Sequence, residues 1–196
     1  RLWQVLTEAP GASLLEENTR FEFSPIEGST NTAAIADTAF YEGVLRWTLR
    51  LDRVIHPHFR YGIVQEGFST FRKSGWAIGN AGDECASLGM LQPFAAFYQD
   101  YGAKGSGPPP FHVSAQVQRA FTDIYFSNET EIHLTLDLGN GTLMTGYQER
   151  QIVIVRDIDS QLGWRPAICC YHTNEQRQSI KLVQAEVDGA LVKAAR

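Results

Sequence analysis

The histidines are the residues of this chain that most readily suggest a metal site. They are His56, His58, His112, His133 and His172. A structural zinc site needs four closely placed ligands, usually pairs of Cys and His at short, recurring spacings. The two histidines around Pro57 have no cysteine at ligand spacing. The pattern therefore predicts solvated loop histidines, and we expect no metal or other cofactor.

Asp157 and Asp159 are separated by one residue, and their carboxylate oxygens could suggest a calcium site. Calcium takes six to eight oxygen ligands, and two acids at one spacing supply too few of them. We therefore expect both aspartates to be turn residues.

The sequence lacks an essential part of a phosphate-binding motif and of a nucleophilic catalytic motif. The run Gly79-Asn80-Ala81-Gly82 has glycines that could expose backbone N–H groups, but it lacks the Gly-Lys-Ser/Thr ending of a phosphate loop. No Gly-x-Ser-x-Gly motif is present, and Cys85 has no partner base evident in the sequence. We expect a turn at the glycines, a packed cysteine, and no catalytic residue.

Glycoside hydrolysis is the strongest enzymatic alternative, because sandwich enzymes can place paired carboxylates on one strand face. The segment with the clearest strand pattern offers only Glu131 and Asp137, six residues apart and too distant to flank one glycosidic bond. A glycan-binding domain without catalysis stays open, because Tyr98 and Tyr101 could stack on sugars. The alternative for these rings is packing of their own segment onto the core.

Composition limits the partners. The 196 residues carry a formal net charge of −5 with no block of Lys or Arg, which disfavours direct nucleic-acid binding. No apolar run is long enough to span a bilayer, so we expect no membrane partner. Three cysteines, Cys85, Cys169 and Cys170, indicate no disulfide framework.

The cysteine count favours a reducing, intracellular setting, in the cytoplasm, the nucleus or an organelle. The chain begins at Arg1 without a methionine or a cleavable-looking signal, so we expect either a fragment of a longer protein or a trimmed chain, without its targeting segment. Asn128 and Asn140 begin Asn-x-Thr triplets, which match the glycosylation pattern but occur often by chance. The sequence leaves the oligomeric state open.

Residues 131–147 predict the element around which the chain is organised. Ile132, Leu134, Leu136 and Leu138 recur at every second position, which is the period of a strand with one buried face. Residues 139–141, Gly-Asn-Gly, then tolerate the positive φ of a tight turn before an extended pattern resumes. We therefore predict a hairpin, and hence a sheet to hold it.

Further strands are expected at spacings of about ten residues, as in a sandwich or barrel. The predicted strands are 21–23, 32–36, 44–52, 59–64, 75–79, 111–117, 151–155, 164–171 and 178–183. Residues 121–126 are ambiguous. We expect a short packed segment over 1–20, a long irregular insert over 80–110, and a terminal helix over 187–195.

In its order of segments the chain resembles a SPRY domain of the B30.2 kind, from about residue 21 to 183. Each motif alone is weak, and the resemblance rests on their order. The matching segments are Gly43 to Arg53, Tyr61 to Val64, Gly75 to Gly79, Leu136 to Leu143 and Trp164 to Ala167. Two segments depart from the family pattern, namely the insert over 80–110 and Gly146-Tyr147-Gln148 after the hairpin.

The resemblance implies an all-β fold, a bent antiparallel sandwich of the concanavalin or jelly-roll kind with short peripheral helices. We expect one domain over residues 1–196, with a core of about 21–183 and a helical tail over 185–196. The resemblance also implies a non-catalytic module that binds a protein or peptide through loops at one end of the sandwich.

Four segments are expected to supply the contacts, because loops on a rigid scaffold commonly carry function and because aromatic and Arg side chains dominate interface energies. They are residues 65–74, 80–84, 98–101 and 172–177. The candidate partner-binding residues are Phe68, Phe71, Arg72, Lys73, Asn80, Asp83, Tyr98, Tyr101, His172 and Arg177.

Overall fold

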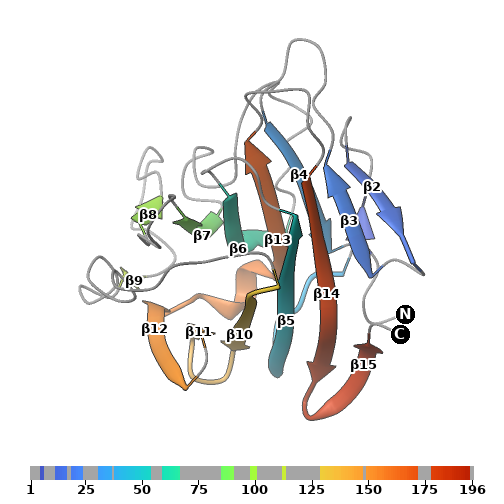
Figure 1. Cartoon of the computed structure of the whole chain (residues 1–196). Coiled ribbons are helices and arrows are strands. Elements are labelled where there is room, and N and C mark those ends of the chain that lie inside the picture. Colours follow the sequence, from blue (N-terminus) through green and yellow to red (C-terminus); the bar gives the residue numbers. More distant parts are fainter. Residues whose placement is uncertain are drawn as a thin grey trace.

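The chain folds into antiparallel strands arranged in two sheets (Figure 1). The structure is a computed structural model, and it describes residues 5–6, 12–16, 19–23, 31–36, 38–53, 59–66, 85–90, 98–100, 112–113, 129–147, 149–171 and 178–194. Within this part of the chain the helical element is η3, a 3₁₀ turn at Ser160–Leu162. No described helix is long and apolar enough to cross a bilayer.

The first sheet has six strands, and β13 and β6 are at its centre. In spatial order the strands are β1 (Val5–Leu6), β4 (Asn31–Ala36), β13 (Trp164–Tyr171), β6 (Phe59–Gln65), β7 (Cys85–Met90) and β8 (Tyr98–Asp100).

The second sheet has nine strands, and β14, β5 and β10 are at its centre. In spatial order they are β2 (Ala12–Leu15), β3 (Arg20–Phe23), β14 (Gln178–Val187), β5 (Val44–Arg53), β10 (Glu131–Asp137), β11 (Thr142–Tyr147), β12 (Arg150–Arg156) and β9 (His112–Val113). The ninth strand, β15 (Ala190–Ala194), pairs with the second half of β14.

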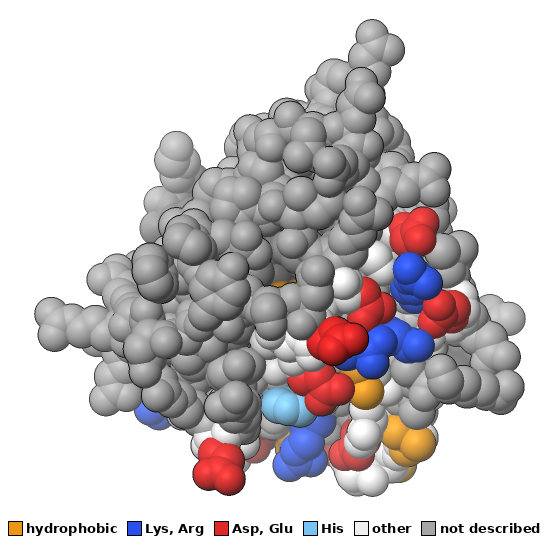
Figure 2. All heavy atoms as spheres, viewed as in Figure 1, with side chains coloured by type: hydrophobic (Ala, Val, Ile, Leu, Met, Phe, Trp, Pro, Cys, Tyr) orange, Lys and Arg blue, Asp and Glu red, His pale blue; other side chains and the backbone are white. Residues whose placement is uncertain are grey.

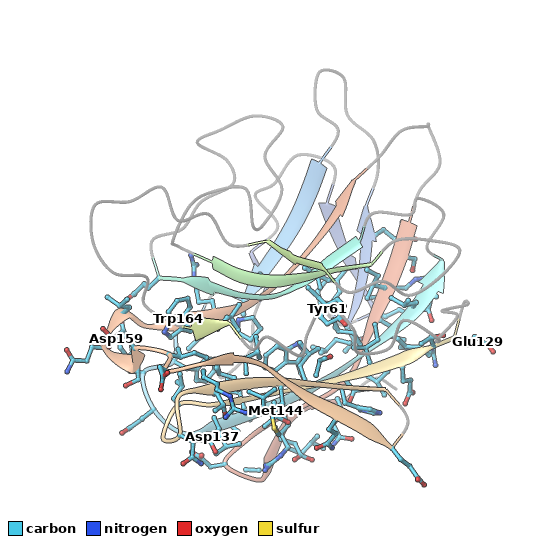
Figure 3. All side chains as sticks on the ribbon, turned by 90° about the vertical axis from the view of Figure 1, so that its left-hand side faces the viewer. Tyr61, Glu129, Asp137, Met144, Asp159 and Trp164 are labelled. Atoms are coloured by element: carbon cyan, nitrogen blue, oxygen red, sulfur yellow. The ribbon has the colours of Figure 1, made fainter. Side chains whose placement is uncertain are left out.

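The core lies between the two sheets, as the side chains in Figure 3 show. Trp47 on β5 and Leu134 on β10 are 3% and 1% exposed, while Tyr61 and Trp164 from the six-stranded sheet are fully buried. Burying one large apolar side chain contributes about 1.5–3 kcal/mol, so these alternating positions hold the sheets together. The all-β sandwich expected from the sequence is confirmed.

The predicted hairpin at 131–147 forms as β10 and β11, with Asp137 opposite Thr142. Burial alternates along β10, with Ile132, Leu134 and Leu136 inside. Of the three turn residues expected to tolerate positive φ, Gly141 is the one that uses it, at φ 63°. Its position is crowded, since a Cβ there would lie 3.1 Å from the Ile158 nitrogen.

The expected terminal helix over 187–195 and helical tail over 185–196 are wrong. Residues Ala190–Ala194 form β15, which returns along β14 with Val187 opposite Ala190. The turn between them is Asp188-Gly189, at φ 50° and 80°, and these are the positive angles that a two-residue hairpin turn needs. An Asp-Gly pair between apolar residues is a strong hairpin signal, and here it outweighs the helix propensity of the alanines after it.

The insert expected to be irregular over 80–110 contains two strands of the six-stranded sheet. β7 pairs with β6 along its whole length, and β8 pairs with β7. Residues 98–100 are therefore strand, and the prediction that they form a loop is wrong. The predicted strand 75–79 and the ambiguous segment 121–126 lie outside the described residues.

Candidate functional site

Several strand connections meet at one end of the sandwich, which we call the turn end. It consists of residues 38–43, 138–141, 157–163, 188–189 and Glu66. In Figure 3, Asp137 and Asp159 lie at this end and Glu129 lies at the opposite end. Several described connections come together at the turn end, which makes it a candidate site.

Backbone hydrogen bonds join these connections to one another. Phe40 and Trp164 exchange two N–H···O bonds of 2.9 Å, and the Glu66 N–H donates to the Gly163 carbonyl over 2.9 Å. The Ile158 N–H donates to the Gly141 carbonyl over 3.0 Å. These hydrogen bonds fix the positions of the connections relative to one another, and loops positioned by a scaffold commonly carry binding residues.

Tyr41 is the exposed aromatic of the turn end. Its side chain is 47% exposed, and its ring lies against Gly163. Gly163 has φ 68°, and a Cβ at this position would lie 2.7 Å from the Tyr41 ring carbon Cζ. Only glycine allows this close approach. The ring is therefore held on backbone while much of its surface faces solvent.

Side-chain and backbone hydrogen bonds hold the 3₁₀ turn η3, which lies next to Gly163. The Asp159 side chain accepts the Gln161 N–H over 3.0 Å. The Trp164 indole Nε1–H donates to the Asp159 carbonyl over 2.7 Å, and the Gly163 N–H donates to the Ser160 carbonyl over 3.2 Å. Asp157 has φ 55° and precedes this turn. The expectation that Asp157 and Asp159 are turn residues is confirmed.

Two further aspartates fix the neighbouring turns. The Asp188 carboxylate accepts the Val44 N–H over 2.8 Å and thereby ties the β14–β15 turn to the start of β5. The Asp137 carboxylate accepts the Asn140 backbone N–H over 2.9 Å and the Asn140 side-chain amide over 2.7 Å. These two bonds, led by the backbone one, lower the pKa of Asp137, and the Gly139 N–H and the charge of Arg46 add to this effect.

The outer face of the nine-stranded sheet is a mixture of charges (Figure 2). The Glu16 carboxylate pairs with Arg20 and with Lys181, at 3.0 Å each, and ties the β2–β3 hairpin to β14. Hydrogen bonds from Lys181 and then Arg20 lower the pKa of Glu16. The Thr48 hydroxyl lies 2.9 Å from His133 Nδ1. Because acids and bases alternate here, this face has the character of a solvated sheet surface.

The described residues contain no group of three or more His, Cys, Asp or Glu side chains that could hold a metal. His112 and His133 lie on β9 and β10, which β11 and β12 separate. His56, His58, His172 and the run 79–82 lie outside the described residues. Glu131 and Asp137 lie at the two ends of β10, about 20 Å apart at the rise of a strand.

Among the described residues, the buried phenol of Tyr61 has the most strongly shifted pKa. Burial raises this pKa, and the Thr145 side chain from the opposite sheet lowers it to a smaller extent. Both residues lie in the core, with Thr145 2% exposed. The shift therefore reports a packed interior and not a reactive cleft.

Most of the predicted contact residues lie outside the described part of the chain. These are Phe68, Phe71, Arg72, Lys73, Asn80, Asp83, Tyr101, His172 and Arg177. Tyr98 lies in β8, opposite Gly89. Their role in binding stays a prediction.

The predicted loops begin at opposite ends of the sandwich. Residues 67–84 connect Glu66, at the turn end, to β7, whose Cys85 lies opposite Val64. Residues 172–177 connect the far end of β13 to the far end of β14, where Ser179 lies opposite Arg53. The expected contact loops therefore start from two ends, and those at 67–84 start beside Tyr41.

Sequence reasoning did not single out Tyr41 as a contact residue. The available signal was an aromatic next to Glu42 and Gly43, in a connection that precedes the clear strand β5. Its partner Gly163 is distant in the sequence, so the rigid placement of the ring becomes visible only in three dimensions.

Comparison with known proteins gives structural likeness alone. No family model matches the sequence, and no curated protein matches it. The SPRY domain of human HERC1 is similar, with a TM-score of 0.60 and 11% identity over 89% of this chain and 93% of that one. The TRIM65 PSpry domain has a TM-score of 0.60 and 13% identity over 93% and 92%.

A stonustoxin structure is also similar, with a TM-score of 0.57 and 15% identity, and it matches 93% of this chain but 27% of its own. At these identities the likeness concerns the fold. The chain has the fold of a SPRY domain, as the order of its sequence motifs implied.

Proposed function

We propose that this chain, with its SPRY fold, is a protein-interaction module without catalytic activity, and that it binds a protein or peptide at the turn end. The observation that carries the proposal is Tyr41, an aromatic side chain 47% exposed on a rigid platform. Tyr is one of the residues that most often dominate binding energy at interfaces, because it offers a large contact area with little rotamer entropy to lose.

The segment that begins at Glu66 supports the same binding location. Glu66 is hydrogen-bonded to Gly163, the glycine under Tyr41. The following residues include Phe68, Phe71 and Arg72, which are again of the types enriched in interface hot spots. One contact surface could therefore combine the described platform with the predicted loop over 65–74.

Affinity capture from a cell lysate, followed by mass spectrometry, tests the proposal. We expect the wild-type chain to retain a defined protein, and Phe71→Ala or Arg72→Ala to release it without lowering the melting temperature. If both variants lose stability as well as binding, these residues belong to the core. If sugars shift the melting curve and no protein is retained, the glycan-binding alternative gains support.

A further inference from the structure

We propose that Asn140 is a site of spontaneous deamidation, and that the Asp137 carboxylate keeps this reaction slow in the folded chain. Asn140-Gly141 is the one Asn-Gly pair of the sequence. Asn140 is exposed at the tip of the β10–β11 hairpin, so water reaches its side-chain amide. The proposal is independent of partner binding.

The chemistry requires these two residues, water and a base from the solvent. The Gly141 backbone nitrogen loses its proton to the base and attacks Asn140 Cγ, forming an N–C bond. The Cγ–Nδ2 bond then breaks, and Nδ2 takes a proton back from the protonated base and leaves as ammonia. The resulting succinimide adds one water and opens to aspartate or isoaspartate. A glycine after the asparagine favours the reaction because it has no side chain to obstruct the attack.

Asp137 opposes this attack by holding the asparagine side chain in another direction. Its two oxygens accept the Asn140 N–H over 2.9 Å and the Nδ2 amide over 2.7 Å. The bond from Nδ2 draws the side-chain amide back toward β10, and the bond from the backbone N–H holds the main chain of Asn140 beside the same carboxylate. For Cγ to meet the Gly141 nitrogen, the amide bond to a charged acceptor must break, and a bond of this kind is worth more than a neutral one.

The backbone of the turn adds a second restraint. The Gly141 carbonyl accepts the Ile158 N–H over 3.0 Å, which couples the turn to residues 157–163. Gly141 is buried and has φ 63°, with Ile158 backbone atoms close to where a Cβ would be. Rotation of this peptide toward the geometry of attack therefore disturbs a packed contact.

Deamidation would in turn weaken the contact between Asp137 and residue 140. The Nδ2 donor that now lies 2.7 Å from Asp137 is replaced by a carboxylate oxygen. Two carboxylates at this distance repel each other, which raises the pKa of at least one of them. An aged molecule would therefore carry one more negative charge at the turn end and a weakened hairpin tip.

Peptide mapping by mass spectrometry after incubation in mildly alkaline buffer tests the proposal. We compare the folded wild-type chain, the variant Asp137→Ala, and a synthetic peptide of residues 137–143. We expect deamidation at Asn140 to be about tenfold slower in the folded chain than in the peptide, equivalent to about 1.4 kcal/mol. We expect deamidation of Asn140 in folded Asp137→Ala to be almost as fast as in the peptide. Asn174, which precedes Glu175, serves as an internal comparison.

A control is needed because a less stable variant could react through its unfolded state. Ser179→Ala removes the hydroxyl that accepts the Arg20 Nε–H over 3.0 Å, at the other end of the sandwich. We expect it to leave the rate at Asn140 unchanged. Equal acceleration by Ser179→Ala, or a wild-type rate equal to that of the peptide, would overturn the proposal. The variant Asp137→Asn gives an independent test, because an amide oxygen replaces one charged acceptor and should accelerate the reaction less than alanine does.

Discussion

Replacing Gly163 by alanine tests the packing that fixes Tyr41. Gly163 has φ 68° and ψ 133°, and an alanine Cβ would lie 2.7 Å from the tyrosine ring. The matched control is Gly189→Ala, because Gly189 also has a positive φ, of 80°, but a Cβ there meets nothing within 4 Å. The control therefore measures backbone strain without a side-chain clash.

The expected magnitudes separate the two variants. A positive φ costs a residue with a Cβ about 1–2 kcal/mol. At Gly163 the combination of φ 68° and ψ 133° is less often adopted, so the expected cost of backbone strain there is about 1–3 kcal/mol. Alanine recovers about 0.4–1 kcal/mol by restricting the unfolded chain. Displacing the Tyr41 ring adds roughly 1 kcal/mol of lost contact. At the midpoints of these ranges, we expect Gly189→Ala to cost about 0.8 kcal/mol and Gly163→Ala about 2.3 kcal/mol.

A double-mutant cycle isolates the contribution of the ring. Chemical denaturation gives the free energy of unfolding for Gly163→Ala, Tyr41→Ala and the pair, and we expect a coupling of about 1 kcal/mol. In a chain of this length the larger loss corresponds to a fall in melting temperature of about 4–12 °C. A coupling of zero would refute the account, because it would mean that the ring does not lie on Gly163.

Three further predictions concern the scaffold. Trp47→Ala should unfold the chain, because truncating a buried large aromatic costs about 3–5 kcal/mol of a total of about 5–15; circular dichroism that shows a folded variant would mean that β5 is wrongly assigned. The pKa of Glu16 is lowered in the fold, so the contribution of its pair with Lys181 is present above the unfolded pKa near 4.5 and is lost as pH falls. The melting temperatures of wild type and Glu16→Gln should therefore differ at neutral pH and converge in acid; a constant gap would exclude the ion pair. The pKa of Tyr61 is raised by burial, so the unfolded chain ionises first and stability should fall above about pH 10. Tyr61→Phe should reduce this alkaline loss, and an identical loss in both proteins would contradict the burial of the phenol.

The strands with a period of two could be predicted from the sequence, because one face of each is buried and the other is polar. β5, β10 and β14 show this clearly, with Leu45, Leu134 and Ile180 inside and Arg46, His133 and Lys181 on the outer face. Local turn chemistry was equally informative at Gly141.

Other elements depend on contacts that no local pattern contains. β7 reads Cys-Ala-Ser-Leu-Gly-Met, without an alternation of polar and apolar residues, and it forms by pairing with β6. At 187–195 the alanines and lysine favour a helix, but the Asp-Gly turn and the edge of β14 favour a strand. The placement of Tyr41 on Gly163 joins two distant segments, so no local pattern in the sequence singled out this ring as a contact residue.

The most direct test of the central claim is a titration of the captured partner against three versions of the chain. Tyr41→Ala removes the proposed contact residue, and Leu191→Ala is the matched control, because Leu191 is also a large exposed apolar side chain, 60% exposed on β15. Interface hot spots cost more than about 2 kcal/mol when truncated, so we predict that Tyr41→Ala raises the Kd by about thirtyfold or more. Leu191→Ala should leave the Kd unchanged. Unchanged binding by Tyr41→Ala would contradict binding at the turn end.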